Sequence, residues 1–149
     1  MTDPALQPIN YRAVTTEDLL SLAQFIEPFV SSGKLLPRTT KELKELLPHG
    51  FVAEMEGQMV GFAALEIYSD KLAEIRSLAV AGTRQGYGIG RELVCRCVQR
   101  AREERILEVM AITSADGFFS NCGFEFTLPG ERKALFIQTR DADSGQSAE

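Results

Sequence analysis

Residues 78–91 read LAVAGTRQGYGIGR, an apolar run followed by a loop in which three glycines alternate with other residues. The segment 73–80 predicts a β-strand, and a long helix is expected from about Ile89 to Glu104. Glycine has no Cβ, so the backbone of such a loop can approach a ligand closely. A helix N-terminus adds unpaired N–H groups and the positive end of a dipole. The stretch therefore predicts a loop that binds an anion such as a diphosphate.

Two other phosphate-binding motifs are excluded by inspection. A P-loop needs a Gly-Lys pair followed by Ser or Thr, and the chain contains none. A dinucleotide-binding fingerprint needs Gly-x-Gly-x-x-Gly after a βαβ start, whereas residues 86–90 read GYGIG. The remaining alternative is a glycine-rich turn that binds no ligand.

The segments on both sides of this loop predict alternating blocks of strands and helices. Thr15 with Asp18 and Thr39 with Glu42 have the spacing of helix capping boxes. The turn sequence Glu56-Gly57-Gln58 between two apolar runs indicates a β-hairpin. In chain order we expect a strand at 9–14, helices at 15–33 and 39–48, strands at 51–55, 59–65 and 73–80, a helix at 89–104, a strand at 106–112, a short helix at 115–121, and closing strands at 124–126 and 134–137.

This order favours an α+β fold, in which helices flank one mixed sheet, over a regular βα alternation. The length of 149 residues fits a single domain, which we expect to span residues 1–140. The polar segment 141–149 contains no apolar residue larger than alanine and predicts a disordered tail.

The composition of the chain does not favour nucleic acid, a membrane or a metal ion as a partner. The net charge of −5 argues against nucleic acid as a partner, because binding it requires clustered Lys and Arg. The N-terminus has no signal-peptide pattern and no segment is apolar enough to cross a membrane, so a cytoplasmic location is expected. Cys95, Cys97 and Cys122 lack metal-ligand spacing. We expect them to be free, buried thiols, and we expect no bound metal.

Residues 78–94 resemble the acetyl-CoA motif of the GNAT acetyltransferases, Gln/Arg-x-x-Gly-x-Gly/Ala. Residues 118–124, which read FFSNCGF, look like the second motif of that family, an aromatic helix before Gly-Phe. The resemblance covers residues 9–140 and implies the GNAT fold, with a mostly antiparallel sheet that splays between its fourth and fifth strands. It also implies acetyl-CoA as co-substrate. By this resemblance the pantetheine and acetyl carbonyl contact the main chain of Leu78, Ala79 and Val80, and the pyrophosphate contacts Gln85, Gly86, Tyr87, Gly88, Ile89, Gly90 and Arg91.

A narrower resemblance lies outside the loop. Residues 32–38, SGKLLPR, and residues 73–80, AEIRSLAV, are similar to the acetyltransferase domain of N-acetylglutamate synthases. The chain lacks their amino-acid-kinase domain and would correspond to a short, free-standing form. In those enzymes the arginine after Leu-Pro holds a glutamate carboxylate, which implies this role for Arg38. The same resemblance implies substrate contacts at Leu36, Arg76, Ser77 and Arg132.

Acetyl transfer to an amine also needs a general base and a stabilised thiolate. Glu74 is our candidate for the base, against the alternative of an exposed strand carboxylate paired with a basic neighbour. Thr113 or Ser114 is a candidate for assisting the thiolate, against the alternative of a hydroxyl that caps the next helix. Many GNAT enzymes place a tyrosine general acid four residues before the glycine of the second motif, where this chain has Phe119.

The sequence therefore predicts an N-acetyltransferase that acts by direct attack in a ternary complex, since no cysteine is placed to carry the acetyl group. The expected acceptor is a small acidic amino acid, L-glutamate in the first place, which implies a part in arginine biosynthesis. Two alternatives stay open: another amine, including a peptide N-terminus, and a CoA-binding regulatory module without turnover. A homodimer is compatible with all of these functions.

Overall fold

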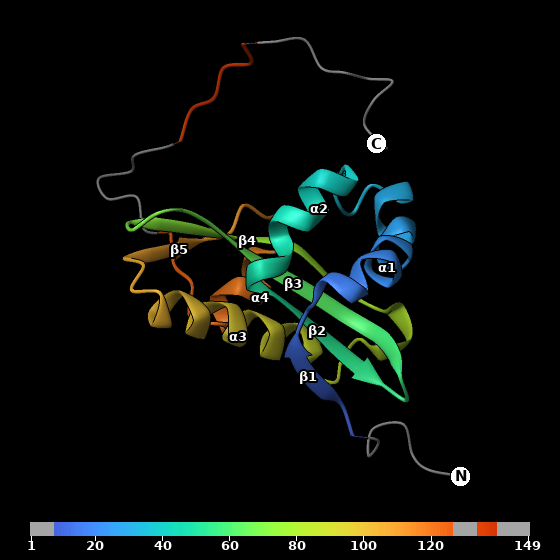
Figure 1. The fold of residues 1–149 in the computed structure, drawn as a ribbon. Coiled ribbons are helices and arrows are strands. Elements are labelled where there is room, and N and C mark those ends of the chain that lie inside the picture. The colour runs from blue at the N-terminus through green and yellow to red at the C-terminus, as the bar shows by residue number, and fades with distance from the viewer. Residues whose placement is uncertain (1–7, 127–133, 140–149) are drawn as a thin grey trace.

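The computed structural model describes residues 8–126 and 134–139, and a five-stranded sheet forms the centre of the described part (Figure 1). Its strands lie in the order β1-β2-β3-β4-β5. The first four are antiparallel neighbours, and β4 runs parallel to β5. The mixed, mostly antiparallel sheet is thus confirmed. The strands are β1 Asn10–Ala13, β2 Gly50–Met55, β3 Gln58–Ser69, β4 Leu72–Val80 and β5 Glu108–Met110.

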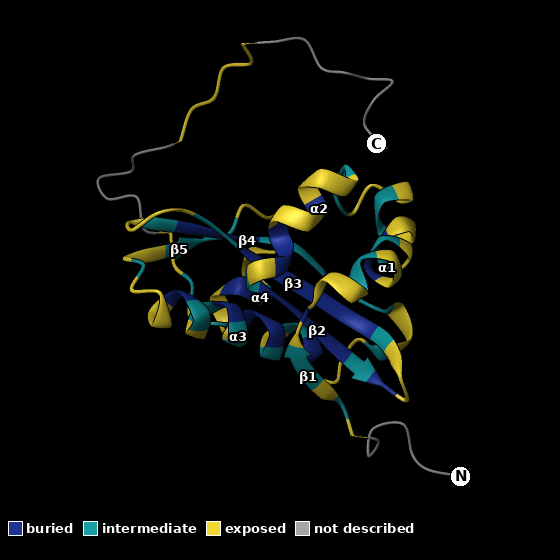
Figure 2. Cartoon of the chain, in the orientation of Figure 1, coloured by how far each residue is buried: buried dark blue, intermediate teal, exposed yellow. Residues whose placement is uncertain are grey.

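Helices cover both faces of the sheet, which gives the α+β sandwich. Figure 1 shows α1 and α2 on one face and α3 on the other. Each face has its own apolar cluster: Leu22, Leu43 and Phe62 belong to the first, and Leu65 and Leu93 to the second. Figure 2 shows the buried residues concentrated along the strands and on the inner faces of the helices. The helices are α1 Leu19–Ser31, α2 Thr40–Leu46, α3 Ile89–Glu103 and α4 Asp116–Asn121, with 3-10 turns at Thr16–Asp18, Leu47–His49 and Gly82–Arg84.

Both predicted capping boxes are present. The Thr15 N–H donates to Asp18 Oδ2 at 2.8 Å. Around α2, the Thr39 N–H donates to Glu42 Oε1 at 2.8 Å, and the Glu42 N–H donates to Thr39 Oγ1 at 3.1 Å. These bonds satisfy N–H groups that a helix start leaves without partners, and so they fix where each helix begins. The start of α2 matters for the site because Arg38 immediately precedes it.

The predicted hairpin is also confirmed, with a turn at Glu56 and Gly57. Both residues have positive φ, 53° and 76°, as a two-residue hairpin turn of type I′ requires. Strand β3 continues to Ser69, beyond the predicted end at Leu65, because it forms a second hairpin with β4. This longer pairing places residues 66–69 beside the first half of β4.

A charged network ties the first strand to the second strand and to the start of α1. Arg12 Nε donates to Glu54 Oε1 at 2.7 Å, and its NH1 donates to Asp18 Oδ2 at 2.8 Å. Hydrogen bonding to this guanidinium holds the pKa of both carboxyls below their ordinary values. The network helps to fix α1 on the face of the sheet that also carries α2.

The last part of the sheet differs from the prediction. Strand β5 has only three residues. It begins after the predicted start, because the Ile106 N–H donates to the Ala101 carbonyl at 2.9 Å and closes the end of α3. The predicted strands at 124–126 and 134–137 are wrong: these residues form no strand, and Phe126 and Leu135 are 89% and 90% exposed. A strand needs a neighbour to pair with, and alternation alone does not supply one. The predicted tail at 141–149 lies outside the described residues.

The described residues include no helix that is both long and apolar enough to cross a membrane. Within the same residues, no group of three His, Cys, Asp or Glu side chains could hold a metal ion. The expectation of buried thiols is correct for Cys97, where burial raises the pKa to about 12. It is wrong for Cys95, which is exposed, while Cys122 is half-buried.

Candidate functional site

The glycine loop joins β4 to α3 with the geometry that an anion site requires. Gly88 is the N-cap of α3 and has φ 79°, a conformation that strains other residues. The first bond of the helix runs from the Glu92 N–H to the Gly88 carbonyl at 3.0 Å. The N–H groups of residues 89–91 therefore precede the helical ladder. A Cβ built on Gly88 would have no atom within 4 Å, so the space next to this backbone is open.

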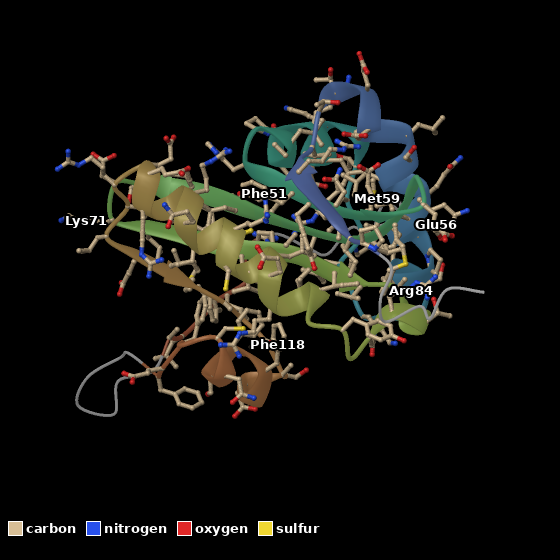
Figure 3. The ribbon with its side chains drawn as sticks, turned by 90° about the horizontal axis from the view of Figure 1, so that it is seen from below. Phe51, Glu56, Met59, Lys71, Arg84 and Phe118 are labelled. Atoms are coloured by element: carbon tan, nitrogen blue, oxygen red, sulfur yellow. The ribbon has the colours of Figure 1, made fainter. Side chains whose placement is uncertain are left out.

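The third glycine of the motif has a different role. A Cβ on Gly90 would lie 3.2 Å from the ring of Phe118, which belongs to α4. Figure 3 shows Phe118 beside the N-terminal half of α3. The missing side chain at Gly90 thus lets the protein's own α4 pack against α3, and it does not open space for a ligand.

Strand β4 separates from β5 just before the loop. The two strands pair over Leu72–Glu74, and from Ile75 onward this edge of β4 has no strand partner in the part of the chain that the structure describes. Ser77 has φ 57°, rare for a residue with a side chain, and interrupts the register with β3. The segment 78–80 therefore lies at the open end of a V between two strands. In Figure 3, Lys71 and Arg84 mark the two ends of β4.

A polar cluster occupies the first half of β4 on the face that carries α1 and α2. Glu74 stands directly opposite Glu66 on β3, and only 7% of Glu74 is exposed. Arg76 NH1 donates to Glu66 Oε1 at 2.9 Å and lies 3.4 Å from Glu74 Oε1. The Tyr68 hydroxyl donates to Glu74 Oε1 at 2.5 Å. Glu74 is therefore a buried carboxylate held by two donors, not an exposed one.

Arg38 joins this cluster from the segment before α2. Its Nε atom is buried and has no hydrogen-bond partner within residues 8–126 and 134–139. Burial lowers the pKa of Arg38, and the charge of Arg76 lowers it further; Glu42, Glu66 and Glu74 act in the opposite sense. The fold thus brings Arg38 within electrostatic range of the strand residues Glu74 and Arg76, although they are far apart in the sequence. An unpaired buried donor of this kind costs free energy unless a ligand completes it.

Other predicted residues lie around the loop or away from the cluster. Gln85 Nε2 donates to the Val80 carbonyl at 3.4 Å, and Tyr87 is 42% exposed. Leu36 is 70% exposed, and its contact with the substrate stays a prediction. Arg132 lies outside the described residues.

Thr113 and Ser114 are exposed on the turn before α4. The Thr113 hydroxyl accepts from the Ala115 N–H at 2.8 Å, a bond within the turn and not a cap of α4. In the part of the chain that the structure describes, no hydrogen bond joins either hydroxyl to Glu74. Phe119, in place of a tyrosine, is buried edge-to-face between Phe118 and Phe124.

Sequence reasoning missed Tyr68 and Glu66. Both lie on β3 beyond its predicted end, on the face that also carries Phe62 and Ala64. Side chains alternate between the two faces of a strand, so positions 62, 64, 66 and 68 share one face. With the full length of β3 known, this alternation would have placed Glu66 and Tyr68 on the face of Phe62 and Ala64.

Known proteins match most of the chain. The model of the acetyltransferase (GNAT) family matches residues 16–124. An uncharacterized N-acetyltransferase of Chlorobaculum tepidum is 36% identical over 72% of this chain and 70% of its own length. An amino-acid acetyltransferase of Mycobacterium tuberculosis is 34% identical over 79% of this chain and 68% of its own length.

Solved structures show the same fold. A Mycobacterium tuberculosis protein in complex with CoA and one further ligand has a TM-score of 0.69 and 32% identity, over 76% of this chain and 70% of that one. The N-acetylglutamate synthase of Neisseria gonorrhoeae, complexed with coenzyme A and N-acetyl-glutamate, also has a TM-score of 0.69, with 26% identity over 76% of this chain. This chain spans only 27% of the synthase.

Proposed function

Given that the chain belongs to the acetyltransferase (GNAT) family and is an acetyl-CoA-dependent N-acetyltransferase, we propose that its acceptor is a small acidic amino acid, in the first place L-glutamate. The observation that carries this proposal is the buried, unpartnered Nε of Arg38 beside Glu74 and Arg76. A guanidinium binds a carboxylate with two parallel hydrogen bonds, and burial strengthens them. An acidic side chain would complete the donor set of Arg38.

The residues of the loop fit the second substrate, acetyl-CoA. The N–H groups of residues 89–91 and the open space beside Gly88 suit the pyrophosphate. The unpaired edge of β4 near Leu78, Ala79 and Val80 offers main-chain groups to the pantetheine and the acetyl carbonyl. Gln85, Gly86, Tyr87 and Arg91 complete the set of residues proposed to surround the cofactor.

Glu74 is the proposed general base. The acceptor amine must lose a proton before or as its nitrogen attacks the thioester carbonyl, and a buried carboxylate can take that proton directly or through one water. The new C–N bond forms, the C–S bond breaks, and the thiolate of CoA leaves. Thr113 or Ser114 is proposed to donate to that thiolate, and Ser77 and Arg132 to line the acceptor site.

The relatives support an amino acid as the acceptor. Several are amino-acid acetyltransferases, and the bacterial synthase that shares the fold was solved with N-acetyl-glutamate. A part in arginine biosynthesis and a cytoplasmic location follow from the glutamate assignment and are proposed with it. The proposed partner is a small-molecule amine.

Arg38→Ala is expected to raise the KM for L-glutamate by roughly 10- to 100-fold, the size of a lost charge-assisted contact. The KM for acetyl-CoA should stay nearly unchanged, because the loop lies at the other end of β4 from the Glu74 cluster. Steady-state kinetics with each substrate varied in turn would measure both constants. Arg38→Lys should recover only part of the lost affinity for glutamate, because an ammonium group cannot form the two parallel hydrogen bonds that a guanidinium forms with a carboxylate.

Arg102→Ala provides the matched control, because Arg102 is an exposed arginine on α3 away from this cluster. It should leave both constants at the parent values. An Arg38→Ala variant that uses glutamate as well as the parent does would remove the basis of the glutamate assignment. Membership of the acetyltransferase family would be unaffected by that result.

A further inference from the structure

The Tyr68 hydroxyl makes the shorter of the two hydrogen bonds described for the proposed base, Glu74. It donates to Glu74 Oε1 at 2.5 Å and accepts from Arg76 NH1 at 3.0 Å. Arg76 itself reaches Glu74 Oε1 only at 3.4 Å, at the outer limit for a hydrogen bond. The short hydrogen bond from Tyr68 is therefore the main interaction that fixes the orientation of the Glu74 carboxylate.

The two oxygens of Glu74 have different surroundings. Oε1 receives both donors, whereas Oε2 has no hydrogen-bond partner among the residues that the structure describes. A carboxylate oxygen that already accepts a short hydrogen bond is a poorer proton acceptor than one that is free. Oε2 is therefore the oxygen available to a substrate amine or to a bridging water.

We propose that Tyr68 is a positioning residue for the acetyl transfer: its hydroxyl holds Oε1 of Glu74 and so presents Oε2 to the acceptor amine. This inference rests on the proposed function, because it takes Glu74 as the base. In this role Tyr68 contacts neither substrate and acts only through Glu74.

The ionisation of Tyr68 suits the role of a donor. Burial, and to a smaller extent the hydrogen bond to Glu74, raises the pKa of Tyr68 to about 12. The hydroxyl therefore remains protonated throughout the range in which amines lose their protons, and it does not compete with Glu74 for the proton of the acceptor.

Tyr68 has little part in the apolar core. It is 48% exposed at the end of β3, and removing its hydroxyl leaves the ring in place. Tyr68→Phe should therefore fold like the parent protein. Tyr11→Phe is the matched control: Tyr11 lies on β1, an edge strand that β2 separates from β3, and its ring contacts Arg96.

The test is a double-mutant cycle of Tyr68→Phe and Glu74→Gln, run with the amine that the parent protein acetylates most efficiently. Tyr68→Phe alone should lower kcat roughly 5- to 50-fold, the size expected for one lost hydrogen bond to a charged group, with both KM values nearly unchanged. In the Glu74→Gln background the same change should cost little more, because residues that act as a unit are not additive. Tyr11→Phe should keep the parent kcat.

Two results would overturn the proposal: a parent-like kcat for Tyr68→Phe, or a double variant whose loss equals the product of the two single losses. A parent-like rate for Glu74→Gln would overturn it as well, together with the assignment of the base. The cycle uses the amine that the parent protein acetylates most efficiently. If that amine is not glutamate, the glutamate assignment fails, but the cycle still tests the role of Tyr68.

Discussion

Gly88→Glu is expected to abolish measurable binding of CoA. The substitution places a side chain and a negative charge in the open space beside the N-terminus of α3, where the pyrophosphate is proposed to lie. Repulsion between like charges and the loss of the anion's hydrogen bonds together cost several kcal/mol, on the order of a thousandfold or more in affinity. Calorimetric titration with CoA should give a clear isotherm for the parent protein and none for the variant.

Gly57→Glu controls for the backbone and for the charge. Gly57 has φ 76°, nearly that of Gly88, and a Cβ there would also have no atom within 4 Å. It lies in the hairpin turn between β2 and β3 and outside the loop. This variant should bind CoA as the parent does. Equal CoA affinity in the parent and in Gly88→Glu would show that the loop is not the pyrophosphate site.

Glu74→Gln is expected to lower the maximal rate of acetyl transfer roughly 100-fold or more near neutral pH, the contribution of a positioned general base. Glutamine keeps the shape of the side chain and an oxygen that can accept from Tyr68, but it cannot take up a proton. The deficit should shrink as the pH rises, because the acceptor amine then loses its proton to solvent. A pH–rate profile under saturating substrates measures both effects.

Glu54→Gln is the comparison for this prediction, since Glu54 is also a strand carboxylate paired with an arginine. It lies on β2 in the Arg12 network and should keep the parent profile, apart from any loss of stability. If Glu74→Gln reproduces the full pH–rate profile of the parent, Glu74 is a structural carboxylate and the base must be sought elsewhere.

The features that the sequence predicted well are local ones. The capping boxes at Thr15 and Thr39 and the turn at Gly57 depend on residues within a few positions of each other. The glycine loop is equally local, since its glycines and the helix that follows are adjacent in the chain. Short-range steric and hydrogen-bonding rules are enough to identify such features.

The features that the sequence did not reveal depend on contacts between distant segments. Arg38 comes within electrostatic range of Glu74 because α2 packs on the face of the sheet to which Glu74 points, and the buried Nε without a partner among the described residues is evident only from that packing. Tyr68 was missed because the length of β3 is set by its pairing with β4. The apolar segment 134–137 has the composition of a strand but is exposed, and it pairs with no strand among the described residues. Composition alone therefore predicted a strand that the structure does not contain at these positions.

This acetyltransferase is proposed to act on a small acidic amino acid. The decisive experiment measures release of free thiol from acetyl-CoA by the parent protein with L-glutamate, L-aspartate, L-glutamine, L-lysine and a short peptide with a free N-terminus. L-glutamate is expected to give the highest kcat/KM, about tenfold or more above the neutral and basic amines, because only an acidic side chain pairs with Arg38. A higher kcat/KM for a neutral amine, a basic amine or the peptide, or thiol release that no amine stimulates, would contradict it.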